Sequence, residues 1–359
     1  MDERRISTRQ LFSVMLTSRA FGLLVTREGA GNEATATQTA ICAMLALTLF
    51  ALMFFAYKAL NHSGGICAHG GIVRSLCAAF LMLAAACSLT SFSTFVRAVS
   101  DVRNVSQAGL CALIVIVATY AAFKGVECIG RVSFISLWVI AALGVFALAA
   151  NVRLAGAEQL VTAPKLLDDA FVRCFLGMII CPEAVLYIAI NSRVSKKYQK
   201  KFIPLAFFAT QVALYAIFAL LEEGVFGVLR FHLPYPLLSL ASVAEFAVFR
   251  RLDALFVSGW IILTVLRVAA FICGALELTN KSSRSRPAYI GTICAAVFAC
   301  AGIMLLMGAA ATNTLYKMLA LIFAAIIVLV GVQSIMKNRE KGHVFNEDYQ
   351  SDAAECGEA

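Results

Sequence analysis

The stretch FLGMIICPEAVLYIAI, Phe175 to Ile190, is long and apolar like a membrane-spanning helix, yet it places Pro182 and Glu183 side by side at its centre. Proline has no amide hydrogen, and its ring clashes with the carbonyl four residues earlier, here that of Met178. In a membrane, broken backbone is tolerated only where it is buried in protein or lines a cavity. The stretch therefore predicts a bundle of membrane helices with an interrupted helix inside it.

The composition of the whole chain agrees with this prediction. Of its 359 residues, 61% are hydrophobic and only 14% are charged, and the mean hydropathy is +0.85. A soluble domain carries roughly 25% charged residues. The apolar residues come in long runs rather than in period-two alternation, which favours helices over a transmembrane barrel. The charged N-terminus shows no cleavage site, so we expect the first helix to be retained.

Ten apolar runs each approach the roughly 20 residues that a spanning helix needs. They lie at 10–26, 38–60, 72–97, 106–123, 132–150, 174–192, 202–221, 254–278, 288–311 and 314–336. We therefore predict an all-α, ten-helix integral membrane domain over 10–336. The N-terminal residues 1–9 are expected to be cytosolic, and the polar tail, 337–359, to be disordered.

The lysines and arginines between the runs predict the orientation of the chain. With the N-terminus inside, eighteen of the thirty lie in inner segments and ten in outer segments. An excess of basic residues marks the cytoplasmic side, so both termini are predicted to be cytosolic. Two outer segments, 152–172 and 222–253, are too long for simple turns, and helical spacing of apolar residues in 237–248 predicts a short amphipathic helix.

The sequence does not show the motifs or residue spacings that are typical of an enzyme or a metalloprotein. It contains no Walker loop, GxSxG or HExxH motif, so no enzyme and no cofactor is predicted. The net charge of +9 is explained by topology, and no nucleic-acid partner is expected. The cysteines show no CxxC spacing, and we interpret those in apolar runs as small buried residues: Cys42, Cys77, Cys87, Cys111, Cys273, Cys294 and Cys300.

Four ionisable residues lie well inside the predicted spans, away from the terminal residues of each span: Arg19, Glu183, Arg267 and Glu277. Each costs roughly 2.5–3.5 kcal/mol on insertion scales, so such groups usually face the bundle interior or water. Glu277 is close enough to the inner helix end to reach the interface. Arg267 is deeper, and it either reaches the interface or pairs structurally, or else faces a pathway.

The candidate site combines the sixth span with the first. Arg19 falls near mid-membrane, with Ala20 and Gly22 beside it allowing close packing. The break at Pro182 leaves the carbonyls around Met178 and Ile179 without partners, and half-helix ends attract ions. Glu183 could hold a cation, a proton or an amino group, or it could be hydrogen-bonded in a simple kink. The predicted ligand-binding residues are Arg19, Ala20, Gly22, Met178, Ile179, Pro182, Glu183 and Arg267.

The first and sixth spans are five apart, which is the spacing of a five-plus-five inverted repeat. In such folds the first helix of each half is discontinuous and the site lies between these two helices. We therefore expect breaks in helices 1 and 6.

Three stretches resemble one family: ISTRQLFSVML (6–16), YAAFKGVECIGRVSF (120–134), and 235–271 with Tyr235-Pro236, Arg251-Leu252-Asp253 and Trp260. Together they resemble the B subunits of spore germinant receptors, or endospore germination permeases, over about residues 5–336. The resemblance implies a fold similar to that of amino acid–polyamine–cation transporters. It also implies a place in the inner membrane of bacterial spores, and a pocket between helices 1, 3, 6 and 8.

The resemblance further implies a function and partners. Family members are expected to bind a small-molecule germinant, often an amino acid, and to signal to an A subunit and a C-subunit lipoprotein that start ion release. The chain departs from the family after the first span, where SRAFGLLVTREG has one glycine at the expected break and no proline or tryptophan follows. The resemblance therefore does not identify which germinant this chain would bind. A stand-alone proton- or ion-coupled amino acid transporter, and a scaffold in which Arg19 only pairs with Glu183, are the alternatives.

Overall fold

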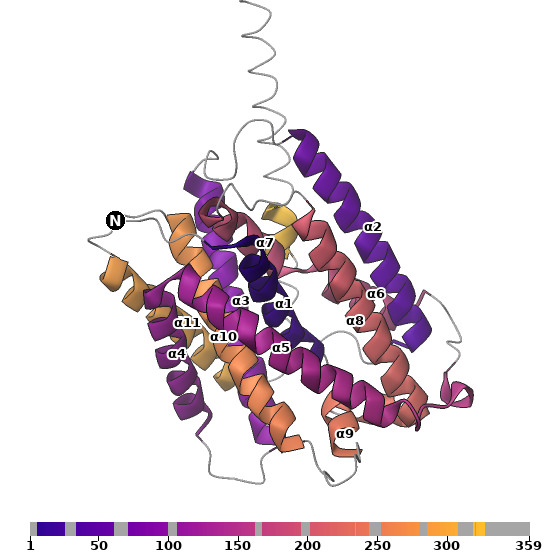
Figure 1. The fold of residues 1–359 in the computed structure, drawn as a ribbon. Helices are drawn as coiled ribbons and strands as arrows, with labels where there is room; N and C mark the ends of the chain where they lie inside the picture. Colours follow the sequence, from indigo (N-terminus) through magenta and orange to yellow (C-terminus); the bar gives the residue numbers. More distant parts are fainter. Residues whose placement is uncertain are drawn as a thin grey trace, which may run out of the picture.

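The computed structural model describes residues 6–25, 34–60, 71–99, 106–161, 167–194, 202–233, 235–243, 253–279, 286–307, 319 and 321–326. The described part of the chain is almost wholly helical (Figure 1). The α-helices are α1 (Thr8–Val25), α2 (Ala36–Leu60), α3 (Gly71–Val99), α4 (Gln107–Lys124), α5 (Val126–Asn151), α6 (Asp169–Ile179), α7 (Pro182–Ile190), α8 (Ile203–Phe226), α9 (Pro236–Val243), α10 (Asp253–Thr279) and α11 (Arg286–Met307). Short 3₁₀ turns join them at η3 (Ala157–Gln159), η4 (Asn191–Arg193) and η6 (Gly227–His232).

The membrane character is confirmed, while the count of ten spans is met only in part. Within the described ranges, six helical segments are long and apolar enough to cross a membrane: 71–99, 107–124, 126–151, 169–190, 203–232 and 255–279. Three further predicted spans coincide with the helices α1, α2 and α11, of which α2 and α11 contain shorter apolar stretches. The predicted tenth span and the polar tail lie largely or wholly outside the described residues.

Helices α1 and α7 lie in the middle of the bundle (Figure 1). Helix α1 packs against α3, α5, α7, α8 and α10, while α10 makes its largest interface with α3. The approach is closest at Gly274 of α10, where an added Cβ would lie 2.8 Å from Leu186 Cδ1 and 3.0 Å from Leu81 Cδ1. The absent side chain therefore lets α10 approach α7 and α3 together.

Helices α4 and α5 present apolar side chains to the outside of the bundle. Only 11% of the most apolar part of α5 is buried, and Ile135, Trp138 and Val145 are exposed. Exposed apolar side chains along a whole helix are what contact with lipid requires. The predicted burial of cysteines holds for six of the seven that were named, but Cys300 is exposed on α11, the helix that also exposes Phe298 and Ile303.

The expected break in the first helix is wrong. Helix α1 is continuous from Thr8 to Val25, through both Arg19 and Gly22. Proline, the strongest helix breaker, does not occur in this segment, and Gly22 does not adopt a positive φ. Gly22 instead provides a close approach, because a Cβ there would lie 3.6 Å from Tyr215 Oη and 3.9 Å from Arg267 Nη1.

The two long outer segments both fold back onto the bundle. In the first, the Gly156 amide donates to the Gly224 carbonyl at 2.9 Å, which attaches the segment before η3 to the end of α8. In the second, the predicted amphipathic helix is found as α9, with Leu237 and Leu240 buried. Residues 244–248, which the prediction included, lie outside the described residues.

A buried charge cluster at a broken membrane helix

The sixth span is interrupted as predicted. Helix α6 ends at Ile179, and the Ile180 amide closes its last turn by donating to the Leu176 carbonyl at 3.0 Å. Cys181 is extended, with φ −119° and ψ 90°, and Pro182 occupies the first position of α7. Proline is favoured at that position, since the first amides of a helix have no partner within it. The proline therefore ends one half-helix and begins the next.

Glu183 lies in the first turn of α7 and is completely buried. Its Oε1 accepts a hydrogen bond from Ser18 Oγ at 2.8 Å and lies 2.9 Å from Arg267 Nη1. Its Oε2 accepts a weak hydrogen bond from Cys181 Sγ at 3.4 Å. The carboxylate thus has one close cationic partner and also benefits from the positive N-terminal end of α7.

Arg267 joins three helices at this point. Its Nε donates to Ser88 Oγ of α3 at 2.8 Å, and its Nη1 also donates to the Ser18 carbonyl of α1. The guanidinium carbon lies 5.3 Å from the centre of the Phe21 ring and 4.9 Å from that of Phe271. Arg267 is thus paired with Glu183 and hydrogen-bonded to Ser88 in this structure.

Arg19 is the third charged member, and its contacts are longer. Its Nη1 is 3.8 Å from Glu183 Oε2, and its guanidinium donates to the carbonyls of Gly177 and Ile180, each at 3.4 Å. These carbonyls belong to the end of α6, where the helix dipole is negative. The carbonyls predicted to lose their helix partners were those around Met178 and Ile179, and the two that Arg19 contacts flank these residues.

Two side chains of α8 complete the surroundings of Arg19. The Tyr215 ring centre lies 5.4 Å from the Arg19 guanidinium carbon, close enough for a cation–π contact. With its amide turned to satisfy both groups, Gln211 Oε1 accepts from Nε and Nη2 of Arg19 at 3.0 Å each. Helix α8 corresponds to the seventh predicted span, 202–221, which was not among the four spans (the first, third, sixth and eighth) expected to line the pocket.

Four of the predicted site residues therefore meet: Arg19, Gly22, Glu183 and Arg267, with Pro182 forming the break. Ala20, Met178 and Ile179 pack in the surrounding apolar core instead. The sequence analysis missed Ser18, Ser88, Gln211 and Tyr215 as members. Their common signal is a polar side chain inside an apolar run.

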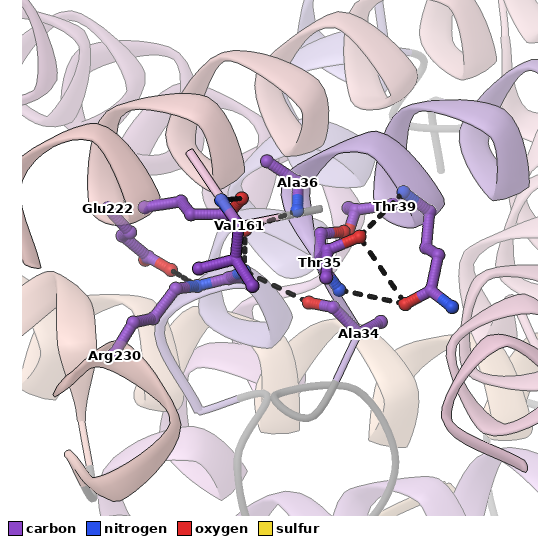
Figure 2. A network of polar contacts seen from close by, with 9 residues as sticks. Ala34, Thr35, Ala36, Thr39, Val161, Glu222 and Arg230 are labelled. Atoms are coloured by element: carbon purple, nitrogen blue, oxygen red, sulfur yellow. Dashed lines mark hydrogen bonds and ion pairs between the residues drawn. The ribbon is translucent and has the colours of Figure 1, made fainter. Parts of the chain in front are cut away.

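A second buried cluster lies where α8 ends. Glu223 is completely buried; it accepts from the amides of Ala36, in the first turn of α2, and Val161, the latter at 2.8 Å. Arg230 Nη1 is 3.3 Å from Glu223 Oε2, and Arg230 Nε is 3.1 Å from Glu222 Oε2. Figure 2 shows Arg230 reaching from Glu222 toward the chain that precedes α2.

The same cluster ties the outer ends of several helices together. Arg230 Nη1 donates to the Ala34 carbonyl at 3.0 Å (Figure 2). Nearby, Gln38 of α2 donates to Asp168 Oδ1 at 3.1 Å, and Asp168 caps α6 by accepting from the Phe171 amide at 2.8 Å. That backbone hydrogen bond, followed by the bond from Gln38, lowers the pKa of the Asp168 carboxyl. The ends of α2, α6 and α8 are thus linked by polar contacts.

The end of the helix that carries Glu222 and Glu223 differs from the prediction. The predicted seventh span ended at residue 221, whereas α8 runs to Phe226 and buries both carboxylates. The available signal was a pair of acids directly after an apolar run, with an arginine seven and eight residues later. Because α8 continues through both glutamates and the 3₁₀ turn η6 follows directly, Arg230 can reach back to them.

The opposite end of the bundle holds a third polar contact. Arg193 Nε lies 2.8 Å from Glu277 Oε2, and the Ile6 amide donates to the Arg193 carbonyl at 3.1 Å. Glu277 was expected to lie close enough to the helix end to reach the interface, and in the structure its side chain is 10% exposed and paired with Arg193. The contact joins the start of α1 and the ends of α7 and α10.

The chain matches a protein-family model over a range that includes most residues of these clusters. A search of curated proteins gave no match. A family model described as "spore germination protein" matches residues 69–314. That range is more than half of the chain and includes α3 to α11, hence Glu183, Arg267 and the α8 cluster. Arg19 lies before it.

Proposed function

Because the chain belongs to the spore germination protein family, we propose that it is the germinant-sensing membrane subunit of a spore germination receptor. Its small-molecule germinant, for which an amino acid is the expected class, would bind near Arg19, Glu183 and Arg267. The observation that supports this most is the coincidence of two buried arginines, one buried glutamate and a broken helix at one depth in the bundle. Charged groups inside a membrane protein commonly mark binding sites.

The broken helix offers a way for binding to be sensed. The cluster joins α1, α3, α7 and α10 through side chains of a few residues, so a ligand that changes one contact changes the fit of several helices. A ligand shifts a two-state equilibrium only if it binds the two states differently. Rearrangement of α7 against α1 and α10 would then pass to an A subunit and a C-subunit lipoprotein in the spore inner membrane.

The test uses spores that carry single variants of the chain. Arg19→Ala and Glu183→Gln are each expected to shift the germinant concentration for half-maximal germination at least tenfold, or to abolish germination. The control is Arg131→Ala, which removes an exposed side chain paired with Glu127 within α5. Unchanged dose–response curves for both site variants, with normal protein levels, would show that the site is wrongly assigned.

A coupled transporter is a second candidate, and one observation favours it. The central cluster lies between two other polar contacts, one at each end of the bundle, as expected for a site that opens to either side in turn. Uptake of radiolabelled amino acid into proteoliposomes that contain this chain alone would distinguish the candidates. Uptake against a gradient supports transport; binding without uptake supports the receptor.

A scaffold role, with no ligand, makes a different prediction. Arg267→Met/Glu183→Met, which removes the close buried pair as a whole, would then retain both stability and germination, because the pair would serve only packing. Loss of germination in that double variant, at normal protein level, would contradict a scaffold role.

A further inference from the structure

We propose that the central cluster recognises its ligand as a carboxylate anion, held by Arg19, and that it does not require an ammonium group on the ligand. Small carboxylic acids that lack an amino group would therefore bind about as well as the corresponding amino acids. This inference rests on the proposed function and narrows the ligand class for the same site.

The first argument is the balance of charge. Among the described residues, the cluster contains the two guanidinium groups of Arg19 and Arg267 and the single carboxylate of Glu183. The C-terminal end of α6 and the N-terminal end of α7 meet at the break, so their opposite dipole charges largely cancel. A net positive charge buried in a membrane bundle is unfavourable, and a bound monoanion would neutralise it.

The second argument concerns Glu183, the group that an ammonium would need. Its Oε1 already accepts from Ser18 and pairs with Arg267 at 2.8 and 2.9 Å. A ligand ammonium that took over this carboxylate would separate it from Arg267. Breaking a buried pair leaves an uncompensated charge and typically costs about 3–5 kcal/mol. Glu183 therefore acts as an internal counter-ion for Arg267.

The third argument concerns Arg19, whose charge is the less closely compensated of the two guanidinium charges. Its donors are met by neutral acceptors, the Gln211 amide oxygen at 3.0 Å and the carbonyls of Gly177 and Ile180 at 3.4 Å, while Glu183 Oε2 is 3.8 Å away. A carboxylate matches the planar donor pair of a guanidinium and would replace a neutral acceptor with a charged one. Arg19 is thus the member of the cluster that would gain most from a bound anion.

Gly22 lies where α1 closely approaches two polar groups of the cluster. The missing side chain of Gly22 lies between Tyr215 Oη, 3.6 Å from its virtual Cβ, and Arg267 Nη1, 3.9 Å from it. Gly22 therefore brings α1 near both a phenol donor and a guanidinium, with no side chain of its own in between. The Tyr215 hydroxyl is a further donor for a carboxylate oxygen.

Binding of matched ligands to the purified full-length chain tests the inference. The probes are L-alanine, L-lactate and L-alaninamide, and the leucine series L-leucine, its 2-hydroxy acid and L-leucinamide. In the series that binds, we expect the amino acid and the hydroxy acid to differ less than about threefold and the amide to bind at least tenfold more weakly. An amide that binds as well as its acid, or a hydroxy acid at least tenfold weaker than its amino acid, would overturn the inference.

Variants of Arg19 provide the second measurement. Arg19→Gln is expected to lower the acid-to-amide preference at least tenfold, and Arg19→Lys to retain part of it, while Arg131→Gln leaves it unchanged. Because the readout is a ratio of affinities on the same sample, partial unfolding does not imitate the result. An unchanged ratio in Arg19→Gln overturns the inference.

The two proposals can fail separately. If the amides bind and trigger germination as well as the acids do, the carboxylate assignment fails and the germinant-sensing function stands. If none of the six probes binds, the assignment also fails, and the response of variant spores to sugars and nucleosides then decides the function. Spores whose germination ignores all site variants would refute the function itself.

Discussion

Arg267 is the residue on which the central cluster depends most. It is the close cationic partner of Glu183, and it also binds Ser88 and the Ser18 carbonyl. A buried ion pair adds little net stability compared with an apolar pair, but removal of one partner is costly. The two effects can be separated because both side chains can be replaced by methionine.

We therefore expect Arg267→Met to destabilise the protein by about 3 kcal/mol, because it leaves Glu183 buried without its close partner. Arg267→Met/Glu183→Met should recover most of this loss. The free energy of unfolding, measured by SDS titration in mixed micelles, gives both values. Arg131→Met, at the exposed pair with Glu127, is the control and should cost less than about 1 kcal/mol. Equal costs for Arg267→Met and Arg131→Met would contradict the prediction.

Much of the residue-level site could be predicted from the sequence, for a simple reason. A charge in an apolar run is costly, so Arg19, Glu183 and Arg267 were identifiable as interior residues without a structure. Their pairing was not, since Arg267 is 84 positions after Glu183 and no local pattern connects them. Hydroxyl and amide side chains such as those of Ser18 and Gln211 are common in membrane helices, so their presence in the sequence does not identify them as site residues.

At the scale of elements, the contrast between the two expected breaks is instructive. Pro182 breaks its helix because it cannot donate a backbone hydrogen bond, and this follows from its covalent structure. Gly22 only permits a break, and here it allows close packing of an unbroken α1 instead. A proline inside a helix therefore predicts a break in it. A glycine allows either a break or close packing, and the neighbouring helices determine which of the two occurs.

Gly274 is the glycine with the tightest surroundings among the described helices α3, α7 and α10. Gly274→Leu should destabilise the protein by about 1–3 kcal/mol, because the new side chain would meet Leu186 and Leu81. Gly291→Leu on α11, where an added Cβ meets nothing within 4 Å, is the matched control and should change stability by less than about 0.5 kcal/mol. Unfolding in mixed micelles measures both. Similar values for the two variants would show that the close approach is absent.

Glu223 should hold the first turn of α2 in place. In Glu223→Ala the amides of Ala36 and Val161 lose a charged acceptor, so their hydrogen exchange should accelerate about tenfold or more. Mass spectrometry of peptides covering these residues provides the measurement. Glu158→Ala, which removes an exposed carboxylate on η3, should change neither rate. Unaltered exchange at Ala36 in Glu223→Ala would contradict this role.

At the scale of the whole molecule, the class and most of the helices followed from hydropathy, while the helix ends did not. Apolar runs give the position of a span, but polar residues at its ends can continue the helix when they find buried partners. That is why α8 extends past Glu222 and Glu223. The orientation in the membrane remains a prediction from the distribution of lysine and arginine.

Reporter fusions test that orientation. Alkaline phosphatase is active only outside the cytoplasm, so a fusion after residue 159 should be active and a fusion after residue 193 or at the C-terminus inactive. A fluorescent protein at the same sites should give the opposite pattern. Active phosphatase at residue 193 with inactive phosphatase at residue 159 would mean that the chain is inserted the other way round.

The separation of Glu183 and Arg267 along the chain also has a consequence for biosynthesis. The half-helix that begins at Pro182 is made well before α10, so during synthesis Glu183 has Ser18 and Arg19 on α1 and its neighbour Cys181, but not its close cationic partner Arg267. Glu222 and Glu223, in contrast, receive Arg230 within eight residues. The end of α8 can thus neutralise its charge as it emerges, whereas the centre of the bundle stays incomplete until α10 has been inserted. Chains truncated before α10 would consequently be the forms that membrane quality control removes.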